Sequence, residues 1–170
     1  MRVDTKKIAY VGVFTALALI AFLIENLLPP LFIPGARLGL GNVFLMLTLV
    51  LYSLPEALLM LAAKCILAAI FGGASALLFS VAAGLSSLVV TYLFFKFFSE
   101  RLSVTAIAAV AATVNNLVQL SVFALYTRST AVFYYAPYLA LTGVAAGVIT
   151  GLTAYFILRY FPFEKRFKQK

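Results

Sequence analysis

The amino-acid sequence predicts an all-α membrane protein with six transmembrane helices, folded as one domain over residues 1–170. Of the 170 residues, 65% are hydrophobic and 11% are charged, whereas a soluble globular domain carries about 25% charged residues. Long apolar runs with Lys or Arg at their edges fill most of the chain. Because roughly 20 apolar residues in a helix cross a bilayer, these runs indicate membrane spans.

The first apolar run, residues 8–28, begins after a basic segment that resembles a signal peptide. The run is long and lacks a small-x-small cleavage site, so we interpret it as a retained helix. The next run, Asn42–Phe71, contains Leu54-Pro55-Glu56. Proline removes a helix hydrogen bond and a carboxylate is costly in lipid, so we expect a turn at this point.

The charges at the two ends of the chain give the number of spans. Lys and Arg precede the first run and follow the last one, so both termini are expected in the cytoplasm and the number of spans must be even. A turn at Pro55 gives six spans: residues 8–28, 38–53, 56–71, 76–98, 103–127 and 133–160. The short second span is expected to tilt, to thin the membrane locally, or to be partly re-entrant.

The residue inventory excludes several classes of function. The chain has no His and one Cys, Cys65, which argues against thiolate or imidazole metal sites, haem, redox pairs and disulfides. The net charge of +8 lies at the ends of the apolar runs, where it acts as a topology signal. We therefore expect a lipid bilayer as surroundings, no nucleic-acid partner, no metal and no cofactor.

Small residues mark predicted helix contacts. Gly143, Gly147 and Gly151 are four residues apart and share one face of the last helix. Small residues let helix backbones approach closely in lipid, where packing drives association. The pattern predicts a close contact, either within the chain or with a partner. Gly12 and Ala16 form a shorter version on the first helix.

Few polar residues lie within the spans, and each is costly to desolvate. Lys64 is expected in the middle of the third span, where it either contacts an anionic or carbonyl-bearing ligand or counter-charge, or snorkels or pairs with Glu56 or Glu25. Asn115 and Gln119 share one face of the fifth span, because they are four residues apart. Amides at depth either grip a ligand or join neighbouring helices.

Charged and aromatic residues gather at the expected outer end. Ordinary interfacial charges and an aromatic belt explain them as well as a binding site does. The alternative is an outward-facing pocket of positive character, suited to an anion or a flat heterocycle. The residues expected to bind a ligand are Arg37, Asn42, Lys64, Asn115, Asn116, Gln119, Tyr126, Arg128 and Tyr138.

The first outer loop carries the most informative motif, Pro34-Gly35-Ala36-Arg37-Leu38-Gly39-Leu40-Gly41-Asn42. Pro34-Gly35 predicts a turn, Gly39 and Gly41 permit positive φ or close approach, and Asn42 is placed to cap the next helix. The motif resembles the signature of the Gx transporter family, also catalogued as heptaprenyl diphosphate synthase component I. That family in turn resembles the substrate-binding S components of energy-coupling factor (ECF) transporters.

This resemblance implies a six-helix S-component-like bundle whose ligand site opens to the outside, with the first loop as part of its lid. It also implies a transmembrane coupling subunit in contact with small residues of the first helix, at the place of Gly12 and Ala16, and separate ATPase subunits. The chain itself has no Gly-x-x-x-x-Gly-Lys-Ser/Thr phosphate loop.

The catalogued name suggests prenyl-chain elongation, which needs clustered Asp residues to hold Mg²⁺ and diphosphate. This chain has a single Asp, Asp4, and we therefore expect no enzyme. The sequence predicts a multi-pass subunit of the cell membrane that captures a small vitamin-like or anionic compound for an ECF-type importer. The alternative is a non-catalytic membrane subunit that serves heptaprenyl diphosphate or quinone synthesis, or membrane electron transfer.

Overall fold

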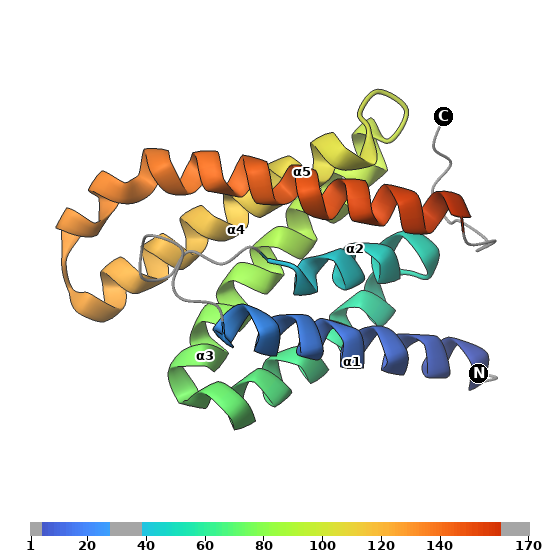
Figure 1. Cartoon of the computed structure of the whole chain (residues 1–170), viewed down its shortest axis with the longest axis horizontal. Helices are drawn as coiled ribbons and strands as arrows, with labels where there is room; N and C mark the ends of the chain where they lie inside the picture. Colours follow the sequence, from blue (N-terminus) through green and yellow to red (C-terminus); the bar gives the residue numbers. More distant parts are fainter. Residues whose placement is uncertain (1–4, 28–38, 161–170) are drawn as a thin grey trace.

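The computed structural model describes residues 5–27 and 39–160, and every regular element in these two ranges is helical (Figure 1). The elements are α1 (Thr5–Leu27), α2 (Gly41–Leu51), α3 (Leu54–Phe98), α4 (Val104–Thr127), the 3₁₀ helix η1 (Thr130–Tyr135) and α5 (Ala136–Tyr160). Four segments are long and apolar enough to cross a membrane: α1, α3, α4, and η1 together with α5. The structure thus confirms the expected fold class, an all-helical protein with several helices able to cross a membrane.

The second expected span is much shorter than residues 38–53. Helix α2 has 11 residues, about 16 Å of rise, against a hydrocarbon core of about 30 Å. Most of its side chains are buried, and Leu47, Leu49 and Val50 have no exposed surface. It lies between α1 and α5 as an internal helix (Figure 1). Helix length therefore does not support six full crossings.

Helix α3, 45 residues long, covers two predicted helices, 56–71 and 76–98, and has a kink between them. Its first turn contains Pro55, where the missing N–H breaks no helix bond, so the predicted turn lies where expected. At Gly73 the backbone has φ 76° and ψ −176°, a conformation essentially restricted to glycine. Gly73 divides α3 into a first arm, residues 54–72, and a second arm, residues 74–98, which form a V (Figure 1).

The expected glycine contact joins α5 to α4 within the chain. A Cβ added at Gly147 would lie 2.4 Å from the Cα atom of Ala109. Equivalent Cβ atoms at Gly143 and Gly151 would lie 2.8 and 2.7 Å from the Cα atoms of Thr113 and Thr105. These three glycines, called the glycine ridge below, let the two backbones meet directly.

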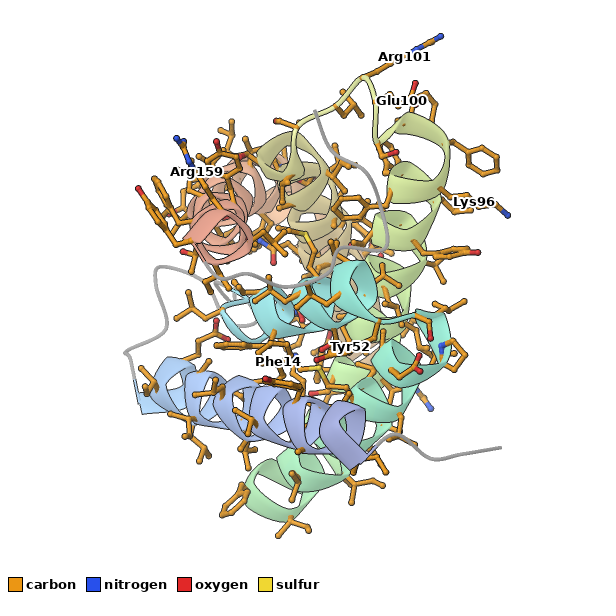
Figure 2. All side chains as sticks on the ribbon, turned by 90° about the vertical axis from the view of Figure 1, so that its right-hand side faces the viewer. Phe14, Tyr52, Lys96, Glu100, Arg101 and Arg159 are labelled. Atoms are coloured by element: carbon orange, nitrogen blue, oxygen red, sulfur yellow. The ribbon has the colours of Figure 1, made fainter. Side chains whose placement is uncertain are left out.

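The other small-residue pair lies on an uncovered face. Gly12 and Ala16 of α1 are exposed, and a Cβ added at Gly12 would meet nothing within 4 Å. Buried residues of the same helix point toward α2 instead. Figure 2 shows Phe14 and Tyr52 between these helices, and the rings of Phe14 and Phe44 have centroids 6.2 Å apart.

Four chain segments come together at one end of the molecule: the start of α1, the α2–α3 turn, the α3–α4 turn and the end of α5 (Figure 1). Figure 2 views the molecule from this end, where Lys96 and Arg101 project from the α3–α4 region and Arg159 projects from α5. The end of α1, the Gly73 kink and η1 lie toward the opposite end (Figure 1).

Candidate functional site

A small cavity lies among α1, the start of α2, both arms of α3, and α4. We call it the polar cavity. The cavity has a volume of about 30 Å³, measured as the space that the centre of a water molecule can occupy. It therefore holds about two waters. A larger ligand therefore needs these walls to move apart. The lining residues are Phe22, Glu25, Gly39, Gly41, Asn42, Lys64, Phe79, Ser80, Ala83, Gly84, Asn115 and Gln119.

A chain of hydrogen bonds crosses the polar cavity from α3 to α4. Lys64 Nζ donates to Asn42 Oδ1 at 3.0 Å, and Asn42 Nδ2 donates to Asn115 Oδ1 at 3.4 Å. Lys64 is 8% exposed and Asn115 is 3% exposed, so both residues are buried. The structure therefore brings together three of the expected site residues, which come from three different helices.

Gln119 adds an unsatisfied acceptor to the same cavity. It lies one helical turn beyond Asn115 on α4, is 6% exposed, and lines the polar cavity. No described residue donates a hydrogen bond to its buried Oε1 atom. An unsatisfied buried acceptor costs about 1–3 kcal/mol, so a donor that reached this oxygen would stabilise the protein.

Glu25 is the lining residue that sequence reasoning left undecided. Its Oε1 atom accepts a hydrogen bond from the backbone N–H of Leu40, directly before α2. A carboxylate is favourable at this position, because the first turn of a helix has unpaired N–H groups and carries partial positive charge. Glu25 and Lys64 thus place one negative and one positive charge around the cavity.

The start of α2 is shaped by two glycines and one asparagine. Gly39 has φ 71°, which confirms the expected positive φ. A Cβ added at Gly41 would lie 3.2 Å from Lys64 Nζ and 3.0 Å from the carbonyl oxygen of Ala18, which confirms close approach. The expected capping by Asn42 is wrong, because Leu40 is the N-cap residue. The Asn42 side chain is engaged by Lys64 and Asn115 instead.

Several expected site residues lie away from the cavity. Asn116 is buried, and its Nδ2 donates to the carbonyl oxygen of Leu139 on α5 at 3.2 Å, so it joins two helices. Tyr126 and Arg128, at the end of α4, are exposed, as is Tyr138 on α5. None of these four lines the polar cavity. Arg37 and the Pro34-Gly35 turn lie outside the described residues.

A second, smaller cavity of about 20 Å³ adjoins the first and shares Gly39 and Asn42 with it. Ser87, Thr91 and Thr150 line it, and sequence reasoning did not select them. The hydroxyl of Thr91 donates to the Ser87 carbonyl at 2.7 Å. Ser and Thr hydroxyls in membrane helices commonly donate to a backbone carbonyl in the preceding turn. Their presence in a sequence therefore does not indicate a cavity.

The described residues contain no group of three or more His, Cys, Asp or Glu side chains placed to hold a metal ion. The polar groups that line this cavity are one ammonium, one carboxylate, three amides and the hydroxyl of Ser80. These groups bind by hydrogen bonding and charge. They suit reversible binding of a small polar molecule.

Comparison with known proteins identifies the family. No curated protein matches the chain. The sequence model of the family described as heptaprenyl diphosphate synthase component I matches residues 14–157, a stretch that contains every cavity-lining residue named above. The description names a component of a synthase and agrees with the catalogued name expected from the loop motif, heptaprenyl diphosphate synthase component I. This multi-pass helical membrane protein therefore belongs to the heptaprenyl diphosphate synthase component I family.

Proposed function

We propose that this protein is the substrate-capture subunit of an ECF-type importer for a small vitamin-like or anionic compound. One observation carries the proposal: Lys64, Asn42, Asn115 and Gln119, from three helices, line a single cavity inside an apolar bundle. A buried cation and buried amides are costly in a membrane protein. Their convergence on one cavity is explained by a ligand that they bind.

The arrangement of the helices supports an outward-facing site. Lys96, Arg101 and Arg159 lie at the end that also holds the start of α1 (Figure 2), and Lys and Arg favour the cytoplasmic side. In our proposal this end is cytoplasmic. Helices α1, α4 and α5 and the two arms of α3 each cross the membrane. Helix α2 crosses it in part, which brings the total to six. The polar cavity then lies toward the outer side, because Glu25 and Gly39 flank it near the opposite end.

Energy for release would come from partner subunits. The sequence holds no nucleotide-binding phosphate loop, so ATP hydrolysis is assigned to separate ATPases. We assign the contact with the membrane coupling subunit to the exposed face of α1 around Gly12 and Ala16. No described residue fills the space beside Gly12, which leaves room for the backbone of another helix.

The family description favours a second candidate, a non-catalytic membrane subunit that serves heptaprenyl diphosphate synthesis. The two candidates differ in what they retain on purification. A capture subunit retains a small water-soluble molecule and associates with ATPases. A synthase subunit retains a soluble prenyl synthase, whose activity falls when the membrane subunit is deleted.

Native mass spectrometry of the purified protein tests the proposal. We expect a retained small molecule in the wild type and its loss in the triple variant Lys64→Ala, Asn115→Ala and Gln119→Ala. The matched control is Lys96→Ala, which removes an exposed cation remote from the cavity and should leave retention unchanged. Retention by the triple variant would place the ligand elsewhere, and co-purification of a prenyl synthase without a ligand would favour the second candidate.

A further inference from the structure

The hydrogen-bond chain across the polar cavity fixes the direction of each amide. A lysine ammonium only donates, so the Asn42 oxygen must accept from Lys64 Nζ, as observed at 3.0 Å. The Asn42 nitrogen then donates to Asn115 Oδ1. With its oxygen engaged, Asn115 keeps Nδ2 as a donor, and no described residue accepts from that nitrogen.

The next polar group on this face of α4 is a hydrogen-bond acceptor. Gln119 is buried, and its Oε1 atom is an acceptor that no described residue satisfies. Asn115 and Gln119 are four residues apart on one helix, so their Cβ atoms lie about 5–6 Å apart. Both residues line the polar cavity, so its wall holds one unused N–H donor and one unsatisfied carbonyl acceptor.

The charges around the cavity do not favour an anion. Among the described lining residues, Lys64 is the positive side chain and Glu25 is the negative one. The exposed Arg128 does not line the cavity. An uncharged molecule with its own donor beside an acceptor would satisfy the two α4 amides without bringing an unpaired charge into the bundle.

From this complementarity we infer that the polar cavity recognises an uncharged ligand by an amide-like edge, an N–H group adjacent to a carbonyl. The ligand N–H donates to Gln119 Oε1, and the ligand carbonyl accepts from Asn115 Nδ2. This inference rests on the proposed capture function and narrows its ligand class. It predicts that binding depends on the ligand N–H and weakens when that N–H is removed.

Three small probes separate the alternatives by thermal unfolding of the purified full-length protein. Succinimide carries an N–H between carbonyls, N-methylsuccinimide has a methyl group in place of that hydrogen, and succinate is an anion of similar size. With succinimide at tenfold its dissociation constant, Tm should rise by about 3–6 °C. N-methylsuccinimide and succinate should give less than a third of that shift.

Variants of α4 assign the effect to Gln119. Gln119→Leu removes the unsatisfied acceptor, so its Tm without probe should equal or exceed that of the wild type, while its response to succinimide disappears. The matched control is Asn116→Leu, another buried amide of α4. It should lower Tm, because it removes the hydrogen bond that joins α4 to the Leu139 carbonyl of α5, but keep the succinimide response.

Four outcomes would overturn the inference: no shift with any probe, equal shifts for succinimide and N-methylsuccinimide, the largest shift with succinate, or an unchanged succinimide response in Gln119→Leu. The capture function is judged separately, by whether the wild type retains a small molecule in native mass spectrometry. A retained anion together with the largest shift for succinate would sustain capture and reject the amide-like edge.

Discussion

Helix α4 has two faces that meet the rest of the protein in opposite ways. One face packs on the glycine ridge of α5 so closely that an added Cβ at Gly147 would lie 2.4 Å from the Cα atom of Ala109. The other face carries Asn115 and Gln119 into the polar cavity. The first contact is between backbones, and the second surface keeps an unsatisfied acceptor.

This difference separates what holds the bundle together from what it can bind. Lipid offers no hydrophobic drive for helices to associate, so close packing of small residues supplies the stability. The polar face adds desolvation costs to the same helix. We infer that the α4–α5 pair is the rigid part of the fold and that the polar cavity is maintained at the expense of stability.

The largest loss of stability is expected from disrupting the close contact between α4 and the glycine ridge of α5. Gly147→Val would force the backbones of α4 and α5 apart, because its Cβ meets main-chain atoms that cannot rotate away. We expect a loss of about 3 kcal/mol or more in the free energy of unfolding. Thermal and denaturant unfolding of the detergent-purified protein measures it. An unchanged Tm would show that the glycine ridge is not a tight contact.

A smaller effect is expected at the kink of α3, whose two arms both line the polar cavity. A Cβ added at Gly73 meets nothing within 4 Å, but φ is 76° there. Gly73→Ala should therefore lose about 1–3 kcal/mol through backbone strain alone. The same unfolding measurement tests this. A variant as stable as the wild type would mean that α3 runs through this point without the observed kink.

Gly41→Ala probes the polar face and should cost less stability, about 1 kcal/mol. Its Cβ would lie 3.0 Å from the Ala18 carbonyl oxygen and 3.2 Å from Lys64 Nζ, so we expect the flexible ammonium to shift from its position beside Asn42. We expect ligand retention in native mass spectrometry to fall severalfold. Retention equal to that of the wild type would contradict the role given to Lys64.

The smallest effect is expected at Gly12, which serves as the control for all three glycines above. It lies within α1 on an uncovered face, with nothing within 4 Å of an added Cβ. Gly12→Ala should leave the isolated subunit unchanged or up to about 1 kcal/mol more stable, because alanine favours the helix. A large loss of stability would reveal an unrecognised contact at this face.

The parts of this architecture that depend on local spacing could be predicted from the sequence. Residues four apart share a helix face. This spacing predicted both the glycine ridge and the placement of Asn115 and Gln119 on one face of α4. The long apolar runs gave the helical class, and Pro55 gave the turn before α3. Each of these signals is carried by neighbouring residues in the chain.

Features that depend on long-range contacts could not be predicted. Asn42 follows a turn and has the chemistry of a helix cap, but Lys64 and Asn115 approach it from other helices and engage its side chain. The burial of α2 likewise depends on neighbours on both sides. Tyr126 and Tyr138 resemble pocket residues by composition, yet the structure leaves both exposed.

The central claim is that the polar side chains at depth share one molecule-binding cavity. An experimental density map of the wild-type protein, purified without added ligand, tests this most directly. We expect non-protein density in the polar cavity, within about 3 Å of Lys64 Nζ or Gln119 Oε1. Density for a bound molecule only at the exposed Tyr126–Tyr138 end, with Lys64 turned toward lipid, would contradict it.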